Sequence, residues 1–234
     1  MLIPHKHSIF IRRGRSRPPR RACGRGIVVS LLVLLIHALF PTRVDAQPNT
    51  IRFSSLTTAE GLPHDLVNCV LQDHLGYLWF GTQRGLARYD GYAFTVFRHR
   101  RSRPDSLVSD TVNALYEDRR GRLWVGTVSG LDHYEAQSGA FVHHPEIYES
   151  VRAFAEDAQG NLWIGTAGSG LFRYDSDGLF TQFPHDPADP ASLPDDHVNV
   201  LLFDSDGTLW IGTEYGGLVS LDPRGGRFAS YPDP

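Results

Sequence analysis

The sequence predicts an all-β fold, a β-propeller of four four-stranded blades that form part of a ring. The first observation is a frame that occurs four times, Asp-x-x-Gly-x-Leu-Trp-[Phe/Val/Ile]-Gly-Thr followed two or three residues later by Gly-Leu. Its copies fill residues 72–90, 117–135, 156–175 and 203–222. The second observation is the spacing, because the four tryptophans lie 45, 39 and 47 residues apart. A period of about 45 residues with a tryptophan signature is typical of propeller blades.

The first copy shows how each blade is built. Residues 66–97 contain four short apolar segments, LVNCVLQD, LWFGT, LARYD and AFTVF, which predict four strands. Asp73 opens a tight turn after the first segment, and Asp90-Gly91 is a hairpin signal before the last. The same pattern places the blades near residues 66–97, 111–144, 150–183 and 197–231. A β-sandwich would not repeat its turns so regularly, and solenoid coils have shorter periods.

Two residue types of the frame are predicted to be scaffold. The tryptophan and the glycine two residues later point to one face of the second strand, where glycine lets a neighbouring sheet approach closely. These structural positions are Trp79, Trp124, Trp163 and Trp210, with Gly81, Gly126, Gly165 and Gly212.

The count of strands predicts a ring that does not close. Residues 51–56 (IRFSSL) match the fourth strand of the repeat, with Phe53 and Leu56 at its two key positions. Each copy also supplies its own fourth strand, so an extra outer strand at 51–56 would need a further blade. We therefore expect partners in the form of downstream propeller blades.

The N-terminal 46 residues have the features of a secretory signal peptide. A basic segment without acidic residues precedes a fourteen-residue apolar run at 27–40, and Val44-Asp45-Ala46 offers small residues for cleavage. An uncleaved N-terminal anchor is the alternative. Either way, residues 47–234 are the propeller region and are expected in the periplasm, or outside the cytoplasm more generally. Attachment to the inner membrane is expected for an uncleaved signal or a full-length receptor.

Charge and cysteine content exclude several functions. Residues 1–46 hold nine of the 23 Lys and Arg and one of the 26 Asp and Glu, so the rest holds 14 basic and 25 acidic residues, a net charge of −11. Such a balance argues against nucleic-acid binding, which needs a basic face. Cys23 and Cys69 fall on opposite sides of the predicted signal cleavage, and Cys69 is expected to be a core residue. The histidines lack metal-site spacing, so neither a metal nor a cofactor is expected.

The repeated phrase closely resembles the two-component regulator propeller repeat. The resemblance covers residues 51–231. It implies the periplasmic sensor region of a hybrid sensor histidine kinase or a related diguanylate-cyclase receptor. Such receptors carry two seven-bladed propellers, a membrane helix and cytoplasmic signalling domains, and a dimer of the full-length receptor is a further implied arrangement. The sequence itself contains no kinase motif, so transmission of a signal is implied by the resemblance alone.

The residues that differ between copies are the better candidates for recognition. The turn between the second and third strands is expected on the same ring face as the blade-to-blade connections, and variable loops on a fixed scaffold usually carry specificity. The ligand-face candidates are Gln83, Arg84, Ser129, Ser169, Glu214 and Tyr215 in the turns, and His64, Arg101 and Asp195 in the connections. A small molecule or an oligosaccharide is the expected ligand, an input that the resemblance also implies.

Three hypotheses follow from these features. The first is the ligand-sensing region of a two-component receptor, without catalytic activity of its own. The second is a secreted propeller enzyme, such as a lyase or a glycosidase. The third is a protein-interaction propeller. The acidic pairs Glu117-Asp118 and Glu156-Asp157 recur within the frame, which favours a structural role over acid–base catalysis.

Overall fold

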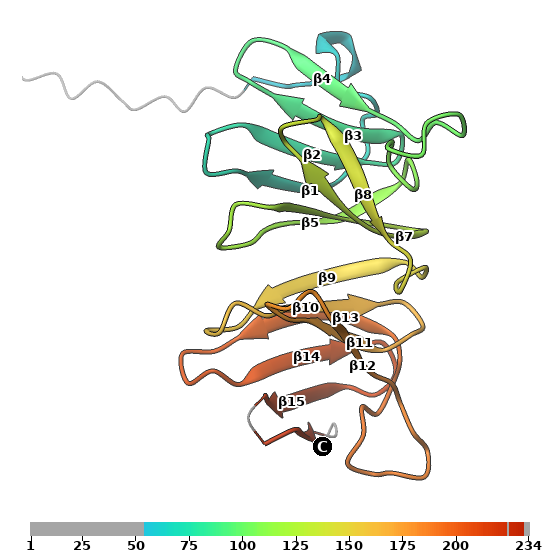
Figure 1. Cartoon of the computed structure of the whole chain (residues 1–234), viewed down its shortest axis with the longest axis vertical. Coiled ribbons are helices and arrows are strands. Elements are labelled where there is room, and N and C mark those ends of the chain that lie inside the picture. The colour runs from blue at the N-terminus through green and yellow to red at the C-terminus, as the bar shows by residue number, and fades with distance from the viewer. Residues whose placement is uncertain (1–53, 224, 232–234) are drawn as a thin grey trace, which may run out of the picture. The chain divides into compact units, whose positions relative to one another are not determined.

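The computed structural model describes residues 54–223 and 225–231, and these form four antiparallel sheets of four strands each (Figure 1). Blade 1 contains β1 (Val67–Gln72), β2 (Leu78–Thr82), β3 (Gly85–Tyr89) and β4 (Phe94–Phe97). Blade 2 contains β5 (Val112–Glu117), β6 (Leu123–Thr127), β7 (Gly130–Glu135) and β8 (Ala140–His144). Blade 3 contains β9 (Val151–Glu156), β10 (Leu162–Thr166), β11 (Leu171–Tyr174) and β12 (Phe180–Phe183). Blade 4 contains β13 (Val198–Phe203), β14 (Leu209–Thr213), β15 (Leu218–Asp222) and β16 (Arg227–Tyr231).

The predicted all-β propeller architecture is confirmed. Within every blade the strands pair in chain order, and the first strands of successive blades contact one another, β1 with β5, β5 with β9 and β9 with β13. The ring does not close, as the sequence also predicted. The extra outer strand expected at 51–56 is not seen: residues 54–56 lie outside every strand, and 51–53 lie outside the described residues. The chain instead enters blade 1 through a capped 3₁₀ turn, η1 (Thr58–Glu60).

Each tryptophan is fixed by the aspartate that opens its frame, an arrangement we call the Asp–Trp clamp. One carboxylate oxygen accepts the indole N–H, and the other accepts two backbone N–H groups of the intervening turn. The indole nitrogen to carboxylate distances are 2.8 Å for Asp73–Trp79, 2.9 Å for Asp118–Trp124, 3.1 Å for Asp157–Trp163 and 2.8 Å for Asp204–Trp210. Trp79, Trp124 and Trp163 can therefore be almost fully buried with their polar atom satisfied.

Burial and hydrogen bonding compete at these carboxylates. Burial disfavours the charged form of Asp118, but the N–H groups of Trp124 and Arg122 outweigh it, so the pKa of Asp118 is lowered. At Asp204 the hydrogen bonds from Trp210 and the turn lower the pKa. The carboxylates of the clamp are thus held as hydrogen-bond acceptors.

Neighbouring blades pack closely at the glycine that lies two residues after the tryptophan. A Cβ added to Gly126 would lie 2.6 Å from Cγ1 of the buried Val151 in blade 3, and one added to Gly165 would lie 2.5 Å from Cγ1 of Val198 in blade 4. The tryptophan beside the glycine meets an aromatic ring of the next blade, with centroids 5.2 Å apart for Trp79 and Tyr134. Cys69 packs in the same layer, and burial raises its pKa to about 12, which is the core role expected for it.

In blades 1 to 3 the face that carries this glycine is covered by the next blade. The same face of blade 4 is not covered by another described blade. Leu218 is 44% exposed, whereas its counterparts Leu86 and Leu171 are fully buried. Val200 and Leu202 of β13 are 57% and 64% exposed on this face. Among the described residues, no valine of another blade approaches Gly212.

Among the described residues, no helix combines the length and the apolar character needed to cross a bilayer. The predicted signal peptide lies outside the described residues.

The glycine contacts predict unequal effects of the same substitution in two blades. Gly126→Ala should lower the free energy of unfolding by about 1 to 3 kcal/mol, because the new methyl group overpacks the blade 2–blade 3 interface. Gly212→Ala is the matched control, since its nearest neighbour is the exposed side chain of Val200, which can move aside. Urea unfolding of both variants measures the difference. Equal destabilisation would contradict a role for glycine in blade packing.

Two histidines of blade 2 lie at the interface with blade 3. Nδ1 of His133 is 2.9 Å from Nε2 of His144, and the His144 ring packs against Trp124 and Phe180 at centroid distances of 5.0 and 5.4 Å. Burial, with His133 and Arg122 nearby, lowers the pKa of His144 from its ordinary 6.5 to about 4. His144 is therefore neutral in the folded protein at neutral pH.

The lowered pKa of His144 predicts a loss of stability in acid. Between pH 6.5 and 4 the unfolded chain binds a proton at this histidine and the folded chain does not, so stability falls as the pH falls. We expect a loss of about 2 kcal/mol over that window, after allowing for partial exposure. His144→Phe, which copies Phe97 and Phe183 of other blades, should show a shallower pH dependence in urea unfolding. Parallel stability profiles for the two proteins would contradict the assignment.

Candidate ligand-binding rim

The turns between second and third strands lie beside the blade-to-blade connections, and together they form one edge of the blades, which we call the rim. In each blade a backbone N–H of the turn donates to a carbonyl of the preceding connection. The pairs are Gln83–Leu66 at 3.4 Å, Val128–Thr111 at 3.1 Å, Ala167–Ser150 at 2.8 Å and Glu214–His197 at 2.9 Å. Residues that are far apart in sequence are therefore placed side by side along the rim.

The turn itself is held by the threonine that ends the frame. Its hydroxyl donates to the carbonyl of the glycine at or just before the start of the next strand, at 2.8 Å for Thr82–Gly85 and 2.8 Å for Thr213–Gly217. Because this backbone is fixed by the frame, the two or three residues inside the turn are free to differ between blades. The frame therefore holds the backbone of the turn, while the residues inside the turn vary between blades.

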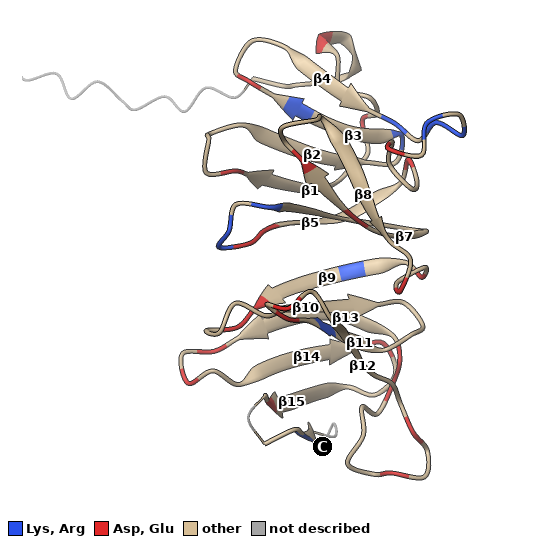
Figure 2. Cartoon of the chain, viewed as in Figure 1, with Lys and Arg blue, Asp and Glu red and all other residues tan. Residues whose placement is uncertain are grey.

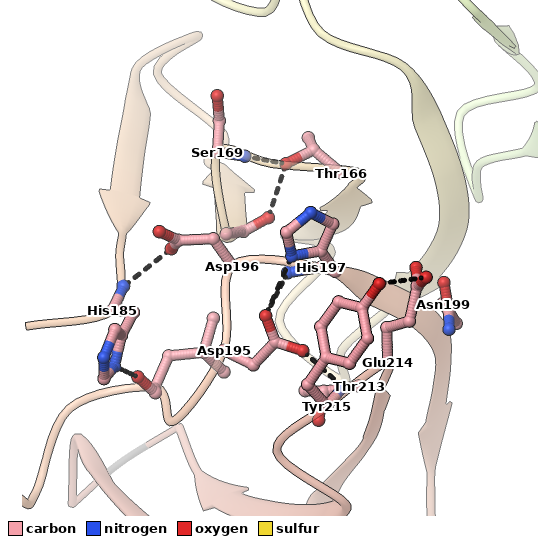
Figure 3. A network of polar contacts seen from close by, with 12 residues as sticks. Thr166, Ser169, His185, Asp195, Asp196, His197, Asn199, Thr213, Glu214 and Tyr215 are labelled. Carbon is pink, nitrogen blue, oxygen red and sulfur yellow. Dashed lines mark hydrogen bonds and ion pairs between the residues drawn. The ribbon is translucent and has the colours of Figure 1, made fainter.

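Blade 4 carries the densest polar network on the rim, and Asp195 is its centre (Figure 3). Oδ2 of Asp195 accepts the Tyr215 backbone N–H at 2.7 Å, and Oδ1 accepts the His197 backbone N–H at 3.0 Å. The His197 ring nitrogen Nδ1 lies 2.9 Å from the same Oδ1. Burial opposes ionisation of Asp195, but these donors outweigh it and its pKa is lowered. Asp195 thus fixes the turn that carries Tyr215.

Glu214 joins this network to blade 3. Its Oε2 accepts from Nη1 of Arg152 at 2.7 Å, and its Oε1 accepts the Tyr215 phenol O–H at 2.9 Å. The same Arg152 nitrogen also donates to Oδ1 of Asn199. Arg152 and Tyr215 lower the pKa of Glu214, while the hydrogen bond to Glu214 raises the pKa of Tyr215. An ionised carboxylate and a protonated phenol are therefore held together at the rim.

Tyr215 is an exposed aromatic residue of the network. The residue is 78% exposed, and its ring meets the His197 ring edge-on with centroids 5.4 Å apart. In Figure 3 the Tyr215 ring stands beside His197 and Glu214. An exposed aromatic face flanked by fixed hydrogen-bonding groups can stack on a flat or ring-shaped ligand and orient it.

The sequence did not single out Arg152, His197 or Asn199. Arg152 occupies the second position of an inner strand, where the other three blades have asparagine. Asn68 and Asn113 use this position to donate to Val112 O and Ser150 Oγ of the next blade, at 2.9 and 3.0 Å. This exchange of asparagine for arginine in one of the four copies is the sequence signal that could have identified Arg152.

The other predicted residues are not brought into this network. The backbone N–H groups of Ser129 and Ser169 donate to the threonine hydroxyl oxygens of their turns, at 3.1 and 3.0 Å. Nδ1 of His64 accepts the Leu66 N–H at 3.0 Å near the start of blade 1. Gln83 and Arg84 lie in the blade 1 turn, and Arg101 lies in the connection after β4. The structure therefore gathers Asp195, Glu214 and Tyr215 of the nine candidates.

The arrangement is suited to binding more than to acid–base catalysis. The pKa values of Asp195 and Glu214 are both lowered, so neither carboxyl group is poised to give up a proton near neutral pH. Within the described residues, no cluster of three or more His, Cys, Asp or Glu side chains could hold a metal ion. Glu117 and Glu156 of the acidic pairs contact neighbouring blades, at His74 and Arg119.

Comparison with known proteins agrees with the repeat pattern. The family model described as two component regulator propeller matches residues 61–84, 106–129, 145–168 and 192–215. The four blades belong to the two-component regulator propeller family. Each match ends in the turn between second and third strands, so the family pattern includes the rim of every blade.

Three known proteins are similar to this chain. The chain is 27% identical to the extracellular domain of a hybrid two-component system, BT3049 of B. thetaiotaomicron, with a TM-score of 0.69 over 76% of this chain and 26% of that one. For the extracellular domain of BT4673, the values are 26% identity, a TM-score of 0.61, and 77% and 24% coverage. The chain is 30% identical over 71 residues to histidine kinase P4 of Formosa agariphila, covering 30% of this chain and 5% of the kinase.

The propeller is therefore of the kind found in extracellular domains of two-component systems, and it spans about a quarter of those domains. A streptogramin B lyase shares the fold alone, at 16% identity and a TM-score of 0.56 over 74% of this chain. Propellers of this architecture thus include enzymes.

The Glu214–Tyr215 hydrogen bond predicts a spectroscopic change. Glu214→Gln replaces a charged acceptor by a neutral one, so the pKa of Tyr215 should move down toward its ordinary value. Difference spectra of phenolate absorbance against pH, with Tyr215→Phe identifying the contribution of this tyrosine, measure the shift. An unchanged titration of Tyr215 would show that the bond is absent in solution.

Proposed function

We propose that this chain is an extracytoplasmic ligand-sensing propeller region of a two-component receptor. The observation that carries the proposal is the Asp195–Glu214–Tyr215 network, which fixes an exposed aromatic ring beside charged groups on the rim of blade 4. The similarity to extracellular domains of two-component systems supports it. The proposed ligand is a small molecule or an oligosaccharide, because a sugar ring offers an apolar face for Tyr215 and hydroxyl groups for Glu214 and His197.

The receptor setting has two further parts. The N-terminal 46 residues act as an export signal or anchor, which places residues 47–234 outside the cytoplasm. Further blades, followed by membrane and signalling segments, complete the receptor. The uncovered apolar face of blade 4, with Val200, Leu202 and Leu218, supports the packing of another blade, since the equivalent faces of blades 1 to 3 are each covered by the next blade.

A binding screen tests this proposal. The purified chain is titrated by calorimetry with short neutral oligosaccharides of different backbone sugars. We expect at least one to bind, and Tyr215→Ala should weaken that binding about tenfold by removing the stacking surface. Tyr92→Ala is the matched control, because Tyr92 is 95% exposed but lies in the β3–β4 hairpin, at the other end of the strands from the rim.

Two results would contradict the proposal. Equal affinities of the Tyr215 and Tyr92 variants for the oligosaccharide would exclude the rim of blade 4 as the binding site. Turnover of a bound oligosaccharide, seen as new reducing ends, would favour the secreted-enzyme hypothesis instead.

A further inference from the structure

Two blade-to-blade connections share one internal structure. We call residues 98–110, between β4 and β5, the basic loop, and residues 184–196, between β12 and β13, the acidic loop. In both, a histidine N–H donates to an aspartate carboxylate, the ring of that histidine contacts the carbonyl of a buried leucine, and a serine hydroxyl bridges the N–H and C=O of the residue after the histidine. In the basic loop these are His99, Arg100, Ser106, Leu107 and Asp110, and in the acidic loop they are His185, Asp186, Ser192, Leu193 and Asp196.

The two loops carry opposite charge on this common scaffold. Arg100 and Arg103 of the basic loop stand where the acidic loop has Asp186 and Asp189. Arg98 and Arg101 add two more cations to the basic loop. Figure 2 shows the connection after β4 in blue and the connection after β12 with red segments. Since one scaffold forms with either set of charges, folding does not require the arginines.

The basic loop is also anchored to blade 2 by an ionisable pair, Asp132 and His143, of which only the aspartate is fully buried. Asp132 is fully buried on β7, and its Oδ2 accepts the Val108 N–H at 2.9 Å. Its Oδ1 lies 2.5 Å from Nδ1 of His143, whose Nε2 lies 2.6 Å from the Pro104 carbonyl oxygen. Both contacts form when the pair carries two protons, either as an imidazolium beside a carboxylate or as an imidazole beside a carboxylic acid.

This anchor has no equivalent at the acidic loop. Val219 and Ser230 of blade 4 stand where blade 2 has Asp132 and His143. The backbone N–H of Phe141 also donates to the Asp105 carbonyl at 2.9 Å. Burying the ionisable Asp132 costs desolvation free energy, and its contacts with Val108 and His143 hold the basic loop in a defined conformation.

Three of the four arginines of the basic loop, Arg98, Arg100 and Arg103, line a cleft. Asp105 and Ser106 of the loop and Phe141 of β8 line it with them. Arg103 is paired with Asp105 at 2.8 Å, and both side chains are about half exposed. Within the described residues, the guanidinium groups of Arg98 and Arg100 form no hydrogen bond or ion pair. These two guanidinium groups are therefore available to bind an anion.

We propose that the cleft of the basic loop binds the oxyanion groups of a polyanionic ligand, either carboxylates or sulfates. A guanidinium group presents a planar fork of N–H donors that matches both oxyanions. Several arginines on one pre-shaped loop favour a ligand with several negative groups, because each bound group adds to the others without further ordering of the loop. This surface is distinct from the Asp195–Tyr215 network on blade 4.

Calorimetric titration of the full chain with three oligomers tests the proposal. Dextran sulfate and oligogalacturonate should bind at low ionic strength, and more weakly as salt is added, while neutral dextran of the same length should not. The comparison of the first two tells sulfate from carboxylate recognition. Equal affinity for neutral dextran would overturn the proposal.

A triple substitution locates the site. Arg100→Asp, Arg103→Asp and Asp105→Ala together copy the acidic loop, whose sequence forms the same scaffold, so the variant is expected to fold. Polyanion affinity should fall at least about tenfold. Arg120→Asp with Arg227→Gln is the control for net charge, because it makes the same change of −3 as the triple variant at exposed residues outside the basic loop. Unchanged affinity of the triple variant, or an equal loss in the control, would show that no such site exists, whatever the result at Tyr215.

Discussion

The Asp–Trp clamp is the interaction on which the rest of the structure depends. An indole ring is large enough to fill the space between two sheets, but its N–H cannot be buried without an acceptor. The aspartate six residues earlier supplies that acceptor and at the same time closes the turn between the first two strands. One side chain therefore satisfies both the local turn and the packing between blades, which explains why aspartate and tryptophan recur together.

Packing between blades follows from the same strand. The glycine two residues after the tryptophan leaves room for a valine of the next blade, and the tryptophan meets an aromatic ring beside it. The three interfaces between the described blades are variations on this one arrangement. The polar rim is then built from what the frame leaves free, namely the turn after Thr213 and its counterparts and the connections between blades.

Much of the fold was predictable, and the reason is physical. Alternating apolar residues, Asp-x-x-Gly turns and a fixed tryptophan spacing are local signals, and four copies allow each to be checked against the others. The candidate site was less predictable. Tyr215 and Glu214 stood out as departures from the repeat, but the role of Arg152 depends on a contact with Glu214 sixty-two residues away. The pairing of Asp132 with His143 could not be predicted from the sequence either, because it depends on the register between β7 and β8.

Contacts between neighbouring blades determine which parts of the structure can move independently. Each described blade touches only its neighbours, so stability is close to a sum over blades and interfaces. Each interface between blades can therefore open and close with its own free energy. Arg152 of blade 3 and the Tyr215 turn of blade 4 lie on either side of the interface between these two blades. A molecule that engages both would hold the two blades together, so that recognition at the rim is coupled to the stability of this interface.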